Sequence, residues 1–349
     1  MKRRQFFKLS LFSLLSSMSN YSFAWLKDVQ KADLMTVRGY ISKKQMGITL
    51  SHEHILVDFI GADKIDTTIY NYDKIYETAL PFLQKVKAAG CQTLIECTPN
   101  YLGRSPLLFK KLSEATGINI LTNTGYYGAV NHKYLPAHVQ TETPQQLANR
   151  WIKEWDEGIE GTGIKPSFMK ISVGDAPISS LQRKIVEAAA LTHSQSGLTI
   201  ASHTGGGGAG MEEIAIIEAK GVSPSAFVWI HAQNEQNREL HFQAAHKGAW
   251  ISFDGLYPAD SKLSAETINL YIDFLTGMKK EKLLHKTLLS QDSGWYHIGE
   301  PNGGNYLPYH LIFTDFIPKL YENGFSRKEI NILMNENPYQ AFRIRKRLK

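Results

Sequence analysis

The chain has 349 residues, of which 43% are hydrophobic and 21% are charged, and its formal net charge is +6. These proportions are those of an ordinary globular protein, and they exclude a mainly disordered or low-complexity chain. The length suits one large α/β barrel, a fold that commonly takes about 250 residues or more as a single unit.

The first 24 residues are predicted to be an export leader rather than part of the fold. Lys2, Arg3 and Arg4 precede an apolar stretch that ends in SFA at 22–24. The order RRQFFK resembles a twin-arginine signal, although Lys2 stands where that signal usually has Ser or Thr. We therefore expect residues 25–349 to form a periplasmic protein. An ordinary secretory signal and an uncleaved anchor are the alternatives.

Removal of the leader would leave 35 basic and 33 acidic residues, a net charge of +2. The remaining basic cluster is the short RIRKR segment at 343–347, which does not amount to a nucleic-acid groove. No later segment has about 18 consecutive apolar residues, so we expect no membrane span in the mature chain. The expected partner is a small-molecule substrate, and a homodimer stays open.

Eight short β-type runs alternate with longer helical patterns along the rest of the chain. This alternation predicts parallel strands with helical crossovers, and eight repeats favour a closed (β/α)8 TIM barrel over an open doubly wound sheet. Apolar residues spaced by three and four predict the buried helix faces, as at Ile75, Ala79, Phe82, Leu83 and Val86. The runs lie at residues 48–55, 93–98, 118–124, 168–173, 199–203, 227–231, 250–253 and 287–291.

Cys91 and Cys97 are the only cysteines in the sequence. Both lie on or beside one predicted strand, which would separate them by about 20 Å. A disulfide needs Cα atoms within about 7 Å. We therefore expect neither a disulfide nor a cysteine-ligated zinc ion.

Four histidines fall at or just before the ends of predicted strands: His52, His54, His203 and His231. Because His52 and His54 are two residues apart, a strand would point both side chains to one face, where they can hold one ion, and Glu53 to the other. Alone, such a pair is more often ordinary polar packing. His203 and His231 each end an apolar run, where a buried imidazole needs a polar partner.

Two other residues belong to the same pattern. Asp292 ends the eighth run, where a carboxylate can bind a metal or accept a proton, although helix capping is the alternative. Lys170 would aim its amine into the barrel, where burial disfavours the charged form. A neutral lysine amine can take up carbon dioxide, and the resulting carbamate has two oxygens that can bridge two cations.

Together these residues resemble the phosphotriesterase-like family of the amidohydrolase superfamily, which includes lactonases and phosphotriesterase-homology proteins. The resemblance covers nearly all of the chain after the leader, with matching order and spacing. Its motifs are GITLSHEH at 47–54, NTGYYG at 123–128, the segment from GIK at 163–165 to Lys170 and Ile171, and NP at 337–338.

The resemblance implies a hydrolase with two divalent metal ions. In that family pattern His52, His54 and Asp292 bind the more buried ion, His203 and His231 bind the outer ion, and Lys170, as N6-carboxylysine, bridges both. A hydroxide between the ions would attack a lactone, carboxylic ester or phosphoester, so Asp292 and Lys170 are the expected catalytic residues. Nitrogen and oxygen ligands favour zinc, although manganese, cobalt or iron would suit the same set.

The sequence departs from the phosphotriesterase pattern along the outward proton path. Asn234 stands where those enzymes carry an acidic residue, and Gly255, after Asp254, stands where they carry a histidine. An amide cannot relay a proton as a carboxylate can. Glu235 could substitute, but a role at a helix start is the stronger expectation. These departures favour lactones or carboxylic esters over synthetic phosphotriesters.

Aromatic residues follow the third and eighth runs and predict an amphipathic small-molecule substrate. Tyr127 and Trp295 are the expected substrate contacts, although aromatic side chains often only hold a long loop in place. The GGGG run at 205–208, ahead of a helix expected at Met211, could bind an anion but is more often a tight turn. The other aromatic residues expected at this mouth are Tyr126, Tyr296, His297, Tyr306 and Tyr309.

Two other functions stay open. The missing relay residues would suit a barrel that binds a metal or small molecule with little turnover. The same superfamily scaffold also supports amide-bond hydrolysis or deamination.

Overall fold

The computed structural model describes residues 32–258 and 262–349, so the predicted leader at 1–24 lies outside the described residues. Each of the eight predicted runs contains a strand of one barrel. These strands are β3 (Thr49–Glu53), β5 (Thr93–Glu96), β6 (Asn119–Leu121) continued by β7 (Asn123–Thr124), β8 (Phe168–Val173), β9 (Thr199–Thr204), β10 (Phe227–Ile230), β11 (Trp250–Phe253) and β12 (Thr287–Leu289).

The strands pair in parallel and close into a barrel. One ladder has the order β3–β5–β6 and the other runs from β7 through β8, β9, β10 and β11 to β12. β12 also meets β3, where the Ser51 hydroxyl donates to the Leu289 carbonyl (3.4 Å) and the Asp292 amide donates to the His52 carbonyl (3.0 Å). The predicted (β/α)8 TIM barrel is therefore confirmed, and the doubly wound alternative is excluded.

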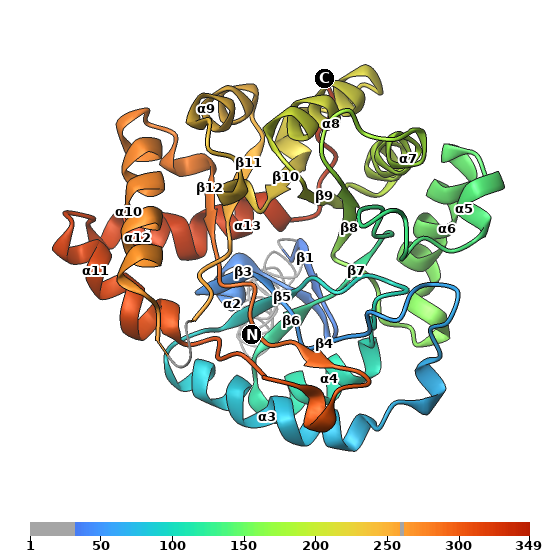
Figure 1. Cartoon of the computed structure of the whole chain (residues 1–349), viewed down its shortest axis with the longest axis horizontal. Coiled ribbons are helices and arrows are strands. Elements are labelled where there is room, and N and C mark those ends of the chain that lie inside the picture. The colour runs from blue at the N-terminus through green and yellow to red at the C-terminus, as the bar shows by residue number, and fades with distance from the viewer. Residues whose placement is uncertain (1–31, 259–261) are drawn as a thin grey trace, which may run out of the picture.

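Helices surround the strands in an outer ring (Figure 1). Each long helix connects two neighbouring strands of the sheet, as expected for parallel strands with helical crossovers. The α-helices after β3 are α3 (Tyr72–Ala88), α4 (Pro106–Thr116), α5 (His138–Thr141), α6 (Pro144–Glu157), α7 (Ser180–Ser196), α8 (Gly207–Ala219), α9 (Arg238–Lys247), α10 (Ala265–Lys280), α11 (Ile317–Glu322), α12 (Arg327–Asn331) and α13 (Asn337–Phe342).

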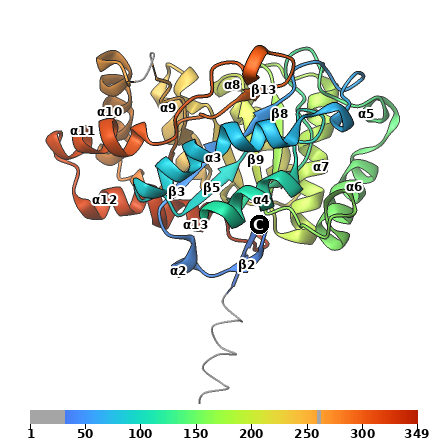
Figure 2. The same ribbon diagram turned by 90° about the horizontal axis from the view of Figure 1, so that it is seen from below.

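A short hairpin and one helical turn close one end of the barrel. β1 (Leu34–Thr36) pairs antiparallel with β2 (Gly39–Ile41), and α2 (Lys43–Met46) follows. Figure 2 shows β2 and α2 at the end opposite β13 (Tyr296–His297), which pairs in parallel with β4 (Leu56–Val57). Since β4 and β13 follow the barrel strands β3 and β12, the strands point their carboxyl ends toward β13, where barrel enzymes carry their active sites.

The hydrophobic core has two parts. The larger part lies between strands and helices, and α3 contributes buried residues to it at the predicted spacing, from Ile75 to Val86. The smaller part fills the barrel interior near its closed end, where Phe168 and Leu288 from the strands meet Phe342 from α13. Apolar side chains therefore occupy the closed half of the interior, and polar ones are left at the carboxyl ends of the strands.

Some predicted limits were wrong by a few residues. β3 ends at Glu53 and β12 ends at Leu289, so His54 and Asp292 lie in the loops directly after these strands. Asp292 has a left-handed backbone (φ 53°), which an extended strand does not allow. The helix expected at Met211 begins at Gly207. The alternation of apolar residues locates a strand well, but its last residues depend on the turn that follows.

Cys91 and Cys97 lie just before and just after β5, and both are buried and free. This confirms that they form no disulfide with each other. Within the two described ranges, no helix is both long enough and apolar enough to cross a membrane.

Candidate metal centre

A pocket of about 270 Å³ opens at the carboxyl ends of the barrel strands. Lys170 comes from the middle of β8 and His203 from the end of β9, while the others come from β3 or from the loops after β3, β10 and β12. The barrel thus brings together side chains from most of the length of the chain. The residues predicted as metal ligands all line this pocket: His52, His54, Lys170, His203, His231 and Asp292.

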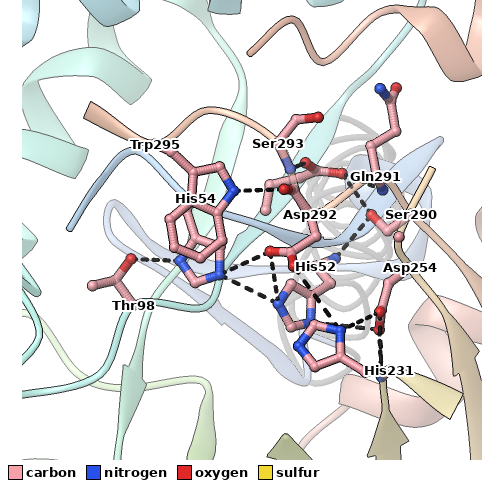
Figure 3. A network of polar contacts seen from close by, with 12 residues as sticks. His52, His54, Thr98, His231, Asp254, Ser290, Gln291, Asp292, Ser293 and Trp295 are labelled. Atoms are coloured by element: carbon pink, nitrogen blue, oxygen red, sulfur yellow. Dashed lines mark hydrogen bonds and ion pairs between the residues drawn. The ribbon is translucent and has the colours of Figure 1, made fainter. Parts of the chain in front are cut away.

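His52, His54 and Asp292 lie close together in the pocket (Figure 3). The Asp292 Oδ1 atom lies 3.3 Å from Nε2 of His52 and 3.1 Å from Nε2 of His54, and the two Nε2 atoms are 3.3 Å apart. Three atoms that can bind a cation therefore face one another across a space of metal-site size.

His231 extends this group toward His203. Ligand atoms of His52, His231 and Asp292 lie within 4.8 Å of one another. The ring centres of His203 and His231 are 4.5 Å apart, and those of His52 and His231 are 5.0 Å apart. The four imidazoles thus form one continuous group. Asp292 lies beside three of them, those of His52, His54 and His231.

Lys170 lines the same pocket and is only 2% exposed. The backbone at Lys170 is closely approached by Gly125 of the NTGYYG segment, where a Cβ atom would lie 2.3 Å from the Lys170 carbonyl oxygen. Gly125 also has a φ of 113°, so glycine is required there for two reasons. The loop after β7 can therefore pass directly over the strand that carries Lys170.

The charges of the pocket favour cation binding. Burial lowers the pKa of His52 to about 3, and burial also lowers the pKa of His203. Burial alone would raise the pKa of Asp292, but His52 and His54 hold it well below its usual value. Neutral imidazoles and an ionised carboxylate are the forms that bind divalent metals.

The residues fit a metal ion in a second respect. Among the described residues, the buried Oδ1 atom of Asp292 has no hydrogen-bond partner. Lone pairs of neutral imidazoles facing a carboxylate oxygen are unfavourable unless a proton or a cation lies among them. The nearest sulfur, Cys97, has a pKa raised well above its usual value by burial and so stays a thiol, which leaves nitrogen and oxygen as the donor atoms.

His54 has supporting partners that we did not predict. Its Nδ1 atom lies 2.7 Å from the Thr98 hydroxyl, which in turn donates to the Glu96 carboxylate (2.6 Å). Fixing Nδ1 leaves Nε2 directed at Asp292. Thr98 lies just past β5 and is the last residue of the predicted run at 93–98, so its position at a predicted strand end was the signal that could have identified it.

Glu53 holds the loop that carries Asp292 through hydrogen bonds to residues on either side of Asp292. As predicted, it does not point toward the histidine pair, and its carboxylate accepts hydrogen bonds from the Ser290 hydroxyl (2.7 Å) and the Ser293 amide (2.7 Å). Burial raises the pKa of Glu53 to about 8. The sequence gives no signal for this role, because the partners are backbone and hydroxyl groups of a distant loop.

Asp254 and Tyr257, in the loop after β11, complete the polar network. Asp254 accepts a hydrogen bond from Nδ1 of His231 (2.7 Å), and the Tyr257 hydroxyl donates to Oδ2 of Asp292 (2.6 Å). Gly255, where the phosphotriesterase pattern has a histidine, lies between them in sequence. A phenol from the same loop therefore reaches Asp292.

The mouth is partly as predicted. Tyr127 and Trp295 line the pocket. The ring centre of Tyr127 lies 5.1 Å from that of His203, and the ring centre of Trp295 lies 4.0 Å from that of His54. The expectation was wrong for Tyr306 and Tyr309, which are buried and bonded to each other, with the Tyr309 hydroxyl donating to the His54 carbonyl (2.6 Å). Tyr126, Tyr296 and His297 also lie outside the pocket lining. These aromatic side chains hold the loops in place.

The glycine run at 205–208 has an internal partner. The Glu235 carboxylate accepts a hydrogen bond from the Gly207 amide (2.8 Å), at the first turn of α8. Glu235 therefore acts at a helix start, as expected, although the helix is α8 rather than the following α9. A Cβ atom at Gly207 would lie 2.6 Å from this carboxylate, so the glycine makes room for it.

A closed barrel whose carboxyl-end pocket gathers imidazoles, a carboxylate and a buried lysine defines a (β/α)8 hydrolase of the metal-dependent type. The sequence model of the Phosphotriesterase family matches residues 32–342 of this chain. The chain therefore belongs to the phosphotriesterase family, whose members use a binuclear metal centre.

Three curated relatives span nearly the whole fold. The phosphotriesterase homology protein of Escherichia coli K12 is 30% identical over 303 residues, which cover 85% of this chain and 98% of the relative. The aryldialkylphosphatase of Saccharolobus solfataricus is 28% identical over 308 residues, which cover 86% and 96%. The N-acetyltaurine hydrolase of Dictyostelium discoideum is 25% identical over 370 residues, which cover 89% and 98%.

A solved structure agrees with the architecture. A double mutant of the organophosphorus hydrolase from Deinococcus radiodurans superposes with a TM-score of 0.77 at 25% identity, covering 89% of this chain and 97% of that one. The relatives' names include both ester-cleaving and amide-cleaving activities, so the family alone leaves the type of bond undecided.

Proposed function

We propose that the chain hydrolyses an ester-type bond, in a lactone, carboxylic ester or phosphoester, with the help of two divalent metal ions. The observation that supports this most is the convergence of Asp292 and the four histidines on one buried pocket with Lys170. Six side chains from five strands, or from the loops directly after them, are more than a single structural contact needs.

Each metal ion would have its own ligands. His52, His54 and Asp292 would hold the inner ion, for which the distances of 3.1–3.3 Å among their atoms are the support. His203 and His231 would hold the outer ion, and Lys170, as N6-carboxylysine, would bridge the two. Zinc is the preferred ion because the donors are nitrogen and oxygen. Bound metal ions would supply an activated water and polarise the oxygen of the substrate.

Asp292 is the residue we propose as proton acceptor. It is ionised and buried, and its Oδ2 atom is anchored by the Tyr257 hydroxyl at 2.6 Å. A carboxylate held in this way has a fixed orientation toward the space in front of His52 and His54. The sequence lacks the usual residues of a proton relay beyond Asp292. In this proposal no ionised group in the loop after β11 would need to replace them.

The lining of the pocket indicates the substrate class. Apart from Lys170 at the metal centre, no lysine or arginine among the described residues lines it, and its outer wall includes Phe59, Val130, Tyr134 and Trp295. A substrate with a phosphate, sulfonate or carboxylate tail would lose hydration there without gaining a counter-charge. We therefore propose a neutral amphipathic ester or lactone, in contact with Tyr127 and Trp295.

Activity on a substrate panel tests this function. The metal-reconstituted protein is assayed with lactones, aryl esters, phosphotriesters and N-acylated amines, alongside the variants Asp292→Asn and Lys170→Ala. We expect turnover of neutral lactones or esters, with both variants at least about 100-fold slower, the usual range for loss of a catalytic proton acceptor. The exposed-site variants Asp63→Asn and Lys328→Ala should match the wild type.

The panel also separates the alternatives. Turnover of amides with amine release, and none of esters, would assign the amide chemistry suggested by the relatives' names. Two bound metal ions without turnover of any class would indicate a binding protein. Export through the leader is a separate proposal, and cell fractionation with and without residues 1–24 tests it.

A further inference from the structure

A second pocket, of about 340 Å³, lies at the opposite end of the barrel. Ser225, Trp250 and Lys286 line it, and each lies just before or at the first residue of β10, β11 or β12. Arg345 and Arg347, from the C-terminal segment after α13, form another wall. Because the strands point their carboxyl ends toward the metal centre, this pocket faces the other way.

The second pocket is positively charged. Lys286, Arg345 and Arg347 line it together with the exposed His285. Glu336 is the one acidic side chain that lines it within the described part of the chain, and Glu336 is already paired with Lys43. The basic C-terminal cluster noted in the sequence therefore has a defined place, which the proposed hydrolase chemistry does not use.

Arg347 is the most unusual of these cations. It is 4% exposed, and the hydrogen bonds of its guanidinium within the described residues all go to neutral oxygens. Burial and the nearby charges of Arg345 and Arg343 lower its pKa to about 9. The acceptors are the Thr199 hydroxyl (3.1 Å) and the carbonyls of Gln340 (2.8 Å), Ala341 (3.0 Å) and Arg343 (3.1 Å).

Arg104 is another buried arginine, but its guanidinium has counter-charges. It is also 4% exposed, but Glu154 and Glu160 contact its guanidinium at 2.7 and 3.0 Å and raise its pKa. A buried cation is costly unless a counter-charge compensates it. Arg104 has two carboxylates of the chain for this purpose, whereas Arg347 lies against a pocket with two more cations.

We propose that the second pocket binds a small oxyanion of the phosphate type, held by Arg345, Arg347 and Lys286. The Arg345 guanidinium can offer paired donors to phosphate oxygens, while Arg347, whose Nη1 and Nη2 groups already donate to oxygens of the chain, and Lys286 add positive charge. Trp250 offers an apolar wall for the carbon part of a phosphorylated small molecule. Free phosphate and a phosphomonoester share the chemistry that this pocket would recognise.

A bound oxyanion would link the C-terminal segment after α13 to the barrel end at which the strands begin. The C-terminal segment already contacts the barrel through backbone bonds, from Arg345 to the Gly197 carbonyl (3.2 Å) and from Ser223 to the Arg347 carbonyl (2.9 Å). Lys286, by contrast, lies before β12. An anion that contacts Lys286 and Arg345 together therefore links two segments and should stabilise the folded state.

Calorimetric titration with inorganic phosphate tests the proposal on the full, metal-loaded protein at constant ionic strength. The test variant is Arg345→Gln, because the structure shows no side-chain hydrogen bond of Arg345 within the described residues that the change would remove. We expect its dissociation constant for phosphate to rise about tenfold or more, as for loss of one charge-assisted hydrogen bond. The matched control, Lys346→Gln, removes the same charge one residue away but outside the pocket lining, and should bind like the wild type.

Phosphate could also bind at the metal ions, so the titration is repeated with Asp292→Asn. Binding that survives in Asp292→Asn and weakens in Arg345→Gln supports the proposal. Binding that is lost in Asp292→Asn and unchanged in Arg345→Gln overturns it, as does an equal loss in Lys346→Gln. A phosphomonoester that binds tighter than phosphate would identify a metabolite as the source, and equal binding would identify the free ion.

Discussion

The Glu53 carboxylate accepts a hydrogen bond from the Ser293 amide at 2.7 Å, so the residue between His52 and His54 holds the loop that carries Asp292. Successive residues of a strand point to opposite faces. His52 therefore faces the pocket, while Glu53 faces the loop after β12. One strand thus supplies one metal-ligand candidate and positions another through its neighbour.

Replacement of Glu53 should loosen the loop that carries Asp292. Glu53→Ala would leave the Ser290 hydroxyl and the amides of Gln291 and Ser293 buried without their acceptor, and each such group costs about 1–3 kcal/mol. We expect the free energy of unfolding in urea to fall by at least about 2 kcal/mol, together with weaker metal binding. An unchanged unfolding midpoint, equal to that of the exposed-site variant Glu114→Ala, would contradict this role.

Asp254 should control metal affinity through His231. Its hydrogen bond to Nδ1 of His231 leaves Nε2 as the ring nitrogen available to a cation. We expect Asp254→Asn to weaken metal binding by about 10- to 100-fold, the usual effect of losing such a partner, with little change in the fold. Competition with a chelator measures this affinity, and Asp63→Asn is the matched exposed control. Wild-type affinity in Asp254→Asn would show that His231 needs no orienting partner.

The sequence predicted the fold and the ligand candidates for a physical reason. Apolar periodicity locates strands, and the carboxyl ends of parallel strands meet at one end of a barrel, so His203, His231 and Asp292 could be assigned to one site. The supporting residues could not be assigned in this way. Glu53 and Asp254 act through hydrogen bonds between segments far apart in sequence. No local sequence pattern indicates which loops pack against each other.

The aromatic residues show the same limit. Trp295 and Tyr309 both follow β12 and look alike in sequence, yet Trp295 lines the pocket and Tyr309 is buried behind His54. The difference depends on the path of the loop, where Trp295 has a left-handed backbone with φ 73°. Composition predicts an aromatic region, but only the backbone conformation decides which ring faces the pocket.

Trp295 should affect substrate binding more than the chemical step. Its ring lies 4.0 Å from His54, and its indole N–H donates to the Asp292 carbonyl (2.6 Å). We expect Trp295→Ala to raise KM for an aryl ester about tenfold, in line with loss of an aromatic contact and its apolar area, and Trp295→Phe to raise it less. Steady-state kinetics with an aryl and a methyl ester check this. Equal KM values in all three proteins would exclude a substrate contact.

Glu213 should make the stability of the barrel depend on pH. Its carboxyl group, on α8, is bonded to the Ser202 hydroxyl (2.5 Å) and the Thr204 hydroxyl (2.7 Å), the two neighbours of His203 on β9. Burial raises the pKa of Glu213 to about 8 from its ordinary value of 4.5. Between these two values the folded protein keeps a proton that the unfolded chain has lost. Stability from this group is therefore fully present below pH 4.5 and is lost as the pH rises toward 8.

The variant Glu213→Gln isolates this effect, because an amide of the same shape has no proton to lose. Loss of stability from one such group proceeds at up to about 1.4 kcal/mol per pH unit. We therefore expect the free energy of unfolding of the wild type, measured in urea at pH 5.5, 6.5 and 7.5, to fall relative to that of Glu213→Gln at each step. Glu53 and Glu96 have similarly raised pKa values, so the variant should keep part of the slope. A difference that does not change with pH would mean that Glu213 is ionised in the folded protein and holds the His203 strand as a carboxylate.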